Sequence, residues 1–251
     1  MKTILKVAIL PVFFLALASA AYADNITLNS SGCSTLPCTN GALQYLGTSP
    51  LNNYTSGGLV APTSPTTGLP NALGFITYSV NPATSGNTVW LTAISGSSWV
   101  SFSTTGASYT PNPTIPNDFY YYETTFTANG GTTPYDGTLS VMADDTAEVL
   151  LNGVVIVPFG TVGSDGACAD GQPTCVSVDT ISLNGTLLNA GTNTLEIINA
   201  QTGVSAEGVD VSANLIQTPE PSSLLLLGTG LLGLAFGLFR KQKASGLTSH
   251  S

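Results

Sequence analysis

The five Lys and Arg residues of this 251-residue chain all lie near its two ends. Lys2 and Lys6 stand at the beginning, and Arg240, Lys241 and Lys243 stand near the end. All fourteen Asp and Glu residues lie between these two groups. Because basic residues favour the cytoplasmic side of a membrane, this partition predicts two cytoplasmic-facing ends and a translocated, acidic middle.

An apolar run follows the first two lysines and extends from Val7 to Leu17. Small residues come next and end in Ala21-Tyr22-Ala23, the A-x-A pattern that signal peptidase cleaves. Residues 1–23 are therefore predicted to be a secretory signal peptide, with Asp24 as the first residue of the mature chain. The alternative is an uncleaved N-terminal anchor, but the apolar run is short for a bilayer span.

A second uncharged stretch runs from Ser222 to Phe239. As a helix it would reach roughly 27 Å at about 1.5 Å per residue, which is near the thickness of the hydrocarbon core. We therefore expect a single transmembrane helix over 222–239 and a basic cytoplasmic tail over 240–251. The preceding Pro219-Glu220-Pro221 disfavours a helix, so we expect it to be extended and open to a protease beside the inner membrane.

The tripeptide Pro219-Glu220-Pro221, the Leu- and Gly-rich span and the cluster that starts with Arg240-Lys241 stand in a fixed order. Together, over residues 218–251, they resemble the PEP-CTERM sorting signal. The resemblance implies that an exosortase-type membrane protease recognises the tripeptide and releases the protein or relays it to the cell envelope, usually in bacteria that export polysaccharide. The plainer alternative is a Pro-rich linker before an ordinary anchor.

The middle of the chain, residues 24–217, is long enough for one domain. Short runs of alternating apolar and polar residues are separated by Gly, Pro and Asn clusters, which predicts an all-β sandwich or barrel. Asn152-Gly153 between two apolar runs predicts a tight hairpin. Residues 24–70 have fewer such runs and are expected to be an irregular segment that either wraps a sandwich formed by 71–217 or is partly flexible. Strands are expected at Leu73–Val80, Thr88–Ile94, Trp99–Ser103, Tyr120–Thr127, Thr138–Met142, Ala147–Leu151, Val154–Phe159, Val176–Leu183, Thr194–Ala200 and Val209–Ile216.

A second resemblance begins at Trp99-Val100-Ser101 and continues in four later blocks, Tyr121–Phe126, Ala143–Gly153, Gly191–Ile197 and Gly208–Val211. In this order they are similar to the blocks of jelly-roll domains of the galactose-binding type. The resemblance implies an antiparallel jelly-roll β-sandwich. It implies no particular ligand, because one fold serves many functions.

The four cysteines fit an oxidising compartment. Cys33 lies close to Cys38 in the sequence, and Cys168 lies close to Cys175, so two local disulfides are favoured among the three possible pairings. Each small loop would contribute about 2 to 2.5 kcal/mol by chain entropy. The alternative, a zinc site made of all four thiolates, lacks the usual C-x-x-C spacing.

Residues 24–217 contain no His, Lys or Arg. A Ser-His-Asp triad, a His-ligated zinc and a Schiff-base lysine are therefore excluded there, and the negative charge opposes nucleic-acid binding. Glycoside hydrolysis survives because it needs only two carboxylates. The candidates are Glu123, Glu148, Glu196 and Glu207, but nothing in the sequence pairs them, so a non-catalytic binding or structural module is preferred.

Two further features suggest ligands. Asp144-Asp145 stands just before a predicted strand and could supply oxygen ligands to Ca²⁺, although Asp also favours turns by bonding its own backbone. Exposed aromatic rings could bind a sugar, whereas most aromatic residues in a sandwich belong to the core. The aromatic candidates are Trp90, Trp99, Tyr109, Tyr120, Tyr121 and Tyr122.

The interpretation is an exported cell-surface protein, processed by signal peptidase and an exosortase, that acts as a non-catalytic component associated with exopolysaccharide or a biofilm matrix. The alternative is a carboxylate-dependent glycoside hydrolase acting on surface polysaccharide.

Overall fold

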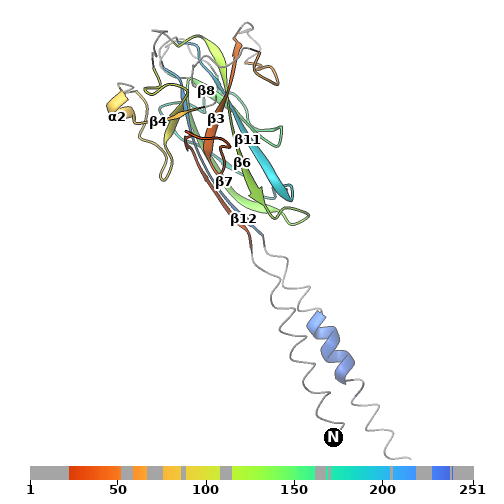
Figure 1. The fold of residues 1–251 in the computed structure, drawn as a ribbon. Helices are drawn as coiled ribbons and strands as arrows, with labels where there is room; N and C mark the ends of the chain where they lie inside the picture. The colour runs from red at the N-terminus through yellow and green to blue at the C-terminus, as the bar shows by residue number, and fades with distance from the viewer. Residues whose placement is uncertain are drawn as a thin grey trace, which may run out of the picture. The chain divides into compact units, whose positions relative to one another are not determined.

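The computed structural model describes residues 23–51, 59–66, 76–85, 89–107, 115–161, 168, 171–203, 206–218, 228–237 and 239. Residues 24–217 form one compact unit, and the residues on either side belong to another. The described part of the first unit contains two six-stranded sheets. Figure 1 shows the long strands β6, β7, β11 and β12 running alongside one another.

The first sheet has the order β10-β7-β12-β5-β4, and β1 also pairs with β12. Its strands are β1 (Asn25–Asn29), β4 (Tyr78–Val80), β5 (Trp99–Ser101), β7 (Tyr135–Asp144), β10 (Asp179–Ser182) and β12 (Gly208–Gln217). The second sheet has the order β2-β3-β6-β11-β8-β9. Its strands are β2 (Ser31–Gly32), β3 (Ala42–Pro50), β6 (Asp118–Ala128), β8 (Thr146–Leu151), β9 (Val154–Val157) and β11 (Gly191–Ala200). A short helix, α2 (Pro82–Ser85), follows β4.

The core lies between the two sheets because alternate residues of their strands are apolar. In β12, for example, Val211 lies opposite Val141 of β7, and both side chains are buried in this core. Tyr120 of β6 stacks on Phe102 with ring centroids 5.2 Å apart. All described pairings between these strands are antiparallel except the short pairing of β2 with β3. The predicted all-β fold, an antiparallel jelly-roll sandwich, is confirmed.

Two local predictions are also confirmed. Asn152 and Gly153 have φ angles of 51° and 78°, and they join β8 to β9 as the expected tight hairpin. These left-handed angles are the reason why an Asn-Gly pair suits this turn. The cysteines form the two expected local disulfides, one between Cys33 and Cys38 and one between Cys168 and Cys175.

The segment that was expected to wrap the sandwich instead supplies strands to both sheets. β1 pairs with β12 in the first sheet, and β3 pairs with β6 in the second. The physical reason is an alternation that is short but regular, since Ile26 and Leu28 of β1 and Leu43 and Tyr45 of β3 all enter the core. Residues 59–66 do cover the outer face of the second sheet, where the Tyr121 hydroxyl donates to the Pro62 carbonyl oxygen over 2.8 Å.

The strand expected at Thr88–Ile94 is wrong for its described residues, 89–94, which form no strand. Here the alternation reflects packing and not sheet pairing. The Trp90 side chain is buried, and the Leu91 N–H donates to the Cys175 carbonyl oxygen over 3.0 Å, so this backbone is bonded to the second disulfide loop.

The second unit is described only in part. Residues 228–237 are helical. No helix in the described parts of the chain is both long and apolar enough to cross a membrane. Ala23 is described and exposed, while Ala21, Pro219, Glu220, Pro221, Arg240 and Lys241 lie outside the described residues.

Candidate ligand-binding pocket

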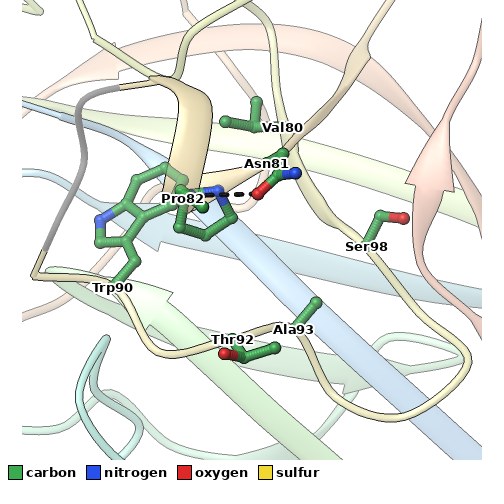
Figure 2. Close-up of a pocket in the computed structure, with 8 residues that line it drawn as sticks. Val80, Asn81, Pro82, Trp90, Thr92, Ala93 and Ser98 are labelled. Atoms are coloured by element: carbon green, nitrogen blue, oxygen red, sulfur yellow. Dashed lines mark hydrogen bonds between the residues drawn. The ribbon is translucent and has the colours of Figure 1, made fainter.

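A pocket of about 560 Å³ opens between the end of β4, α2 and the loop that precedes β5. Its lining residues are Val80, Asn81, Pro82, Ala83, Trp90, Thr92, Ala93 and Ser98, and none of them is charged. Figure 2 shows Val80, Asn81 and Pro82 on one side of this space and Thr92 and Ala93 on the other. The volume falls within the range of roughly 300 to 1,000 Å³ that is usual for small-molecule sites.

Trp90 forms a rigid wall of this pocket. Its ring stacks on that of Trp99 with centroids 4.3 Å apart and planes at 22°. The Trp90 Nε1–H donates to Asp144 Oδ2 over 2.5 Å, and the Trp99 Nε1–H donates to the Leu91 carbonyl oxygen over 2.9 Å. Both indoles are buried and have partners for their polar atoms, so the wall is fixed before any ligand arrives.

Of the aromatic residues proposed as sugar platforms, Trp90 is the one that lines the pocket. Trp99 is fully buried behind it, and Tyr120–Tyr122 are buried within or against the second sheet. Tyr109 lies outside the described residues. Most of these rings are therefore part of the packed interior, which is the usual place of aromatic residues in a sandwich.

Asp210 holds the turn beside the pocket. Its Oδ2 accepts the Ile94 N–H over 2.8 Å, and its Oδ1 accepts the hydroxyls of Ser97 over 2.5 Å and Ser30 over 2.9 Å. Burial raises the pKa of Asp210, while these hydrogen bonds act in the opposite direction. The carboxyl thereby fixes the loop that carries Ala93. Sequence reasoning did not select Asp210, whose signal is a carboxylate between two valines of a strand.

Asp144 and Asp145 lie directly behind the Trp90 wall, and both are buried. Asp145 Oδ2 accepts the backbone N–H of Thr202 over 2.7 Å and also its hydroxyl. Asp144 Oδ1 has no hydrogen-bond partner among the described residues. Burial raises the pKa of Asp144 well above its ordinary value, although the bond from Trp90 opposes the shift. Its carboxyl therefore needs a proton or a cation to neutralise it.

Glu207 lies deeper, between the sheets, and is fully buried. Its Oε1 accepts the Tyr122 hydroxyl over 2.6 Å and the Asn199 amide over 3.1 Å, and its Oε2 accepts the Ser101 hydroxyl over 2.9 Å. Burial raises its pKa to about 7. The same Asn199 amide nitrogen donates to the Asp144 carbonyl oxygen over 2.8 Å, which joins Glu207 to the aspartate pair.

Oxygen atoms suited to a hard cation are present at this junction. Asn199 Oδ1, like Asp144 Oδ1, is buried and has no hydrogen-bond partner among the described residues. Carboxylate and amide oxygens are the ligand types that Ca²⁺ prefers. No group of three or more His, Cys, Asp or Glu side chains in the described ranges is arranged to hold a metal. A cation here would therefore depend on the two aspartates, the Asn199 amide and backbone carbonyl oxygens.

The other three glutamates lie elsewhere, on the outer face of the second sheet. Glu123 of β6 is directly opposite Glu196 of β11, and Glu148 lies on the neighbouring β8. Burial raises the pKa of Glu196, and the charges of Glu123 and Glu148 raise it further. Gln44 donates to Glu123 Oε1 over 3.1 Å. The structure thus does not bring these glutamates together with Glu207, which faces the interior.

Residues 217–241 match the family of the PEP-CTERM protein-sorting motif. The motif indicates an exported protein with a membrane-anchored sorting signal, which implies processing by an exosortase. The sorting signal predicted from the sequence is therefore confirmed. No curated protein matches the chain.

Among solved structures, the chain is similar to a GH26-CBM35 β-(1,4)-mannanase from Podospora anserina, with 19% identity and a TM-score of 0.32 over 58% of this chain and 26% of the mannanase. A family 35 carbohydrate binding module from Clostridium thermocellum has 14% identity and a TM-score of 0.28 over 48% of this chain and 78% of the module. CBM35 from Paenibacillus barcinonensis has 14% identity and a TM-score of 0.26 over 57% of this chain and 88% of the module. Likeness at this level carries no information on ligand or activity.

Proposed function

We propose that the protein is an exported, non-catalytic module that binds extracellular polysaccharide through the pocket at Trp90. The observation that carries the proposal is the pocket itself, which is prebuilt, uncharged and walled by an aromatic ring on the unit that the sorting signal exports. Such a module would serve as a surface component of an exopolysaccharide or biofilm matrix.

The chemistry of the lining supports a sugar as the ligand. Asn81, Thr92 and Ser98 offer uncharged hydrogen-bonding groups, while Val80 and Pro82 offer apolar surface. A sugar ring presents both hydroxyl groups and C–H faces, so it can use both kinds of lining. A nucleotide or another polyanion fits poorly, because residues 24–217 hold no basic side chain to receive its charge.

We further propose that Asp144 and Asp145 bind Ca²⁺ behind this wall. The support is chemical: a buried carboxylate oxygen and a buried amide oxygen lack hydrogen-bond donors, and no basic side chain is available to neutralise Asp144. A cation held there would keep Asp144 ionised. It would then strengthen the bond that Asp144 accepts from Trp90, and so stabilise the pocket.

The glycoside-hydrolase alternative has less support. A hydrolase needs two carboxyl groups about 5 to 10 Å apart on either side of a bound sugar. The described lining residues of the pocket include no carboxylate, and Glu207 is fully buried with three side-chain donors. If the purified protein released reducing ends from a polysaccharide, and the Glu207→Gln variant did not, the hydrolase would replace the binding module.

The binding proposal is tested by filling the pocket. Thr92 is exposed and lines it, so Thr92→Phe should occupy the space without disturbing the core. The matched control is Thr192→Phe, at an exposed threonine of β11 that does not line the pocket. Affinity electrophoresis through gels cast with neutral and acidic polysaccharides should show retardation of wild type and the control, and none of Thr92→Phe. Equal retardation of all three proteins would refute the pocket as the site.

The processing sites are tested separately. The released protein should begin at Asp24, which N-terminal sequencing determines. Glu220→Ala, within the Pro219-Glu220-Pro221 recognition motif, should leave export intact but hold the full-length protein in the membrane fraction. Release of the variant at the wild-type rate, or release in cells without an exosortase, would contradict the proposed role of the tripeptide.

A further inference from the structure

The last hydrogen-bonded rung of the first sheet joins the two places where the chain is expected to be processed. β1 and β12 pair as far as Asn25 and Ile216, and beyond them the Gln217 N–H donates to the Asp24 carbonyl oxygen over 2.8 Å. Asp24 is the predicted first residue of the mature chain. Gln217 is the first residue of the matched sorting motif.

Side-chain bonds hold this rung closed. Asp24 Oδ2 accepts the Tyr135 hydroxyl over 2.8 Å and the Asn129 N–H over 2.9 Å. Tyr135 is itself buried, and it lies opposite Gln217 on the neighbouring strand β7. The end of β12 is therefore fixed on both sides, by Asp24 through β1 and by Tyr135 through β7. We call these four residues, Asp24, Asn129, Tyr135 and Gln217, the terminal latch.

The latch leaves little free chain before the sorting tripeptide, since Thr218 alone separates Gln217 from Pro219. Proteases generally bind their substrates as extended strands that make backbone hydrogen bonds over several residues. The N–H of Gln217 is already engaged. A protease that needs residues on the N-terminal side of Pro219 must therefore wait until the end of β12 opens, and its rate then follows the population of the open form.

We propose that the terminal latch limits the access of the sorting protease to the Pro219-Glu220-Pro221 motif, so that opening of the Asp24–Gln217 rung controls the rate of release. The proposal rests on the proposed processing at the tripeptide. The partner is the exosortase-type membrane protease, and it meets the end of the sandwich where Asp24 and Asn129 lie.

The test uses the full chain in cells that contain the exosortase, with release followed by pulse-chase. Tyr135→Phe keeps the buried ring but removes the hydroxyl that donates to Asp24 and accepts the Gly130 N–H over 3.3 Å. It should speed release about tenfold or more, because a hydrogen bond to a carboxylate contributes about 1.5 to 3 kcal/mol. Tyr120→Phe is the matched control, because the Tyr120 hydroxyl donates to the Pro116 carbonyl oxygen over 2.8 Å in the other sheet. It should leave release unchanged.

A second variant separates access from general loosening of the fold. An insertion of about ten Gly and Ser residues between Thr218 and Pro219 is flexible and gives the protease free chain beyond the latch. It should speed release, and Tyr135→Phe should have no further effect in that background. The latch is refuted if Tyr135→Phe releases at the wild-type rate, if Tyr120→Phe matches its acceleration, or if the effect of Tyr135→Phe persists with the insertion. Failure of Glu220→Ala to retain the protein would instead refute the processing itself.

Discussion

The carboxylates of this domain fall into two groups, both without basic side chains to neutralise them, and the two groups are stabilised in different ways. The inner carboxylates are Asp144, Asp145, Glu207 and Asp210, which are at most 3% exposed. The outer-face glutamates are Glu123, Glu148 and Glu196, which are partly exposed on the second sheet. Neither group has a basic side chain to pair with, because residues 24–217 contain none.

The inner group depends on hydrogen-bond donors supplied by the protein, whereas the outer group depends on water. Three side chains donate to Glu207, and two hydroxyls and a backbone N–H donate to Asp210. A buried donor that loses its acceptor is costly, while charges on a wet surface contribute little. The lesson is that changes of similar chemistry should have very unequal effects in the two groups.

The largest difference is expected for truncation to alanine. Glu207→Ala removes the acceptor of the Tyr122 and Ser101 hydroxyls and one of the two acceptors of the Asn199 amide, and it should lower the free energy of unfolding by about 3 to 5 kcal/mol. Glu148→Ala, on the outer face, should change it by no more than about 0.5 kcal/mol. Urea denaturation at pH 5 measures both values. Similar losses in the two variants would break the distinction between the groups.

The next difference is in pH dependence. Burial raises the pKa of Glu207 from 4.5 to about 7, so the folded state binds this proton more tightly than the unfolded chain. The resulting stabilisation is fully present below pH 4.5 and is lost as the pH rises to about 7, a total of about 3 kcal/mol. Denaturation from pH 4 to 8 should show this fall in wild type and a smaller one in Glu207→Gln. Glu148→Gln is the control and should lose stability with rising pH as the wild type does. If Glu207→Gln also lost as much stability as the wild type, the raised pKa of Glu207 would be contradicted.

Calcium sharpens the comparison further, because only the inner group assembles candidate ligands. Ca²⁺ should raise the melting temperature more than NaCl of equal ionic strength. The free energy of unfolding should increase by about 2.7 kcal/mol when the Ca²⁺ concentration is about 100 times its Kd. The double change Asp144→Asn and Asp145→Asn should remove this excess. The double change Glu148→Gln and Glu196→Gln removes the same charge from the outer face and should keep it. Equal responses of wild type to the two salts would exclude the calcium site.

The smallest effect is expected within the outer group. Glu196 lies directly opposite Glu123, so Glu196→Gln should stabilise the fold by about 0.5 kcal/mol at low salt by relieving repulsion between like charges. The gain should shrink at physiological salt, because salt screens the repulsion between partly exposed charges. Asp179→Asn makes the same change of charge on β10, in the other sheet, and should increase the free energy of unfolding by less. Urea denaturation at the two salt concentrations is the measurement, and a gain in Glu196→Gln that does not depend on salt would argue against repulsion.

The sequence predicted the elements whose signals are local. The long alternation of β6 and the Asn-Gly turn between β8 and β9 could be read directly, and so could the two cysteine pairs. β1 was missed although its five residues alternate in the same way, because a short run among Ser and Thr looks irregular until its partner is known. That partner, β12, lies at the other end of the domain.

The site was less predictable for the same reason. Trp90 and Asp144 were both selected from the sequence, but for separate reasons, and only the fold brings the indole N–H to the carboxylate. The lining residues Asn81 and Ser98 carried no signal of their own, and the carboxylate of Asp210 between two valines did not by itself indicate a site. They become part of the site because β4, β5 and β12 are neighbours in one sheet.

The pairing of β1 with β12 joins the first strand of the domain to its last. Contacts between such distant segments give a high contact order, which slows folding. If the N-terminus leaves the cytoplasm first, β1 must wait on the far side of the membrane until β12 has also crossed. A partly exported chain therefore cannot complete its first sheet. Closure of that sheet marks the moment at which the whole domain is outside, and the folded sandwich can no longer slide back through a channel that admits only an unfolded chain.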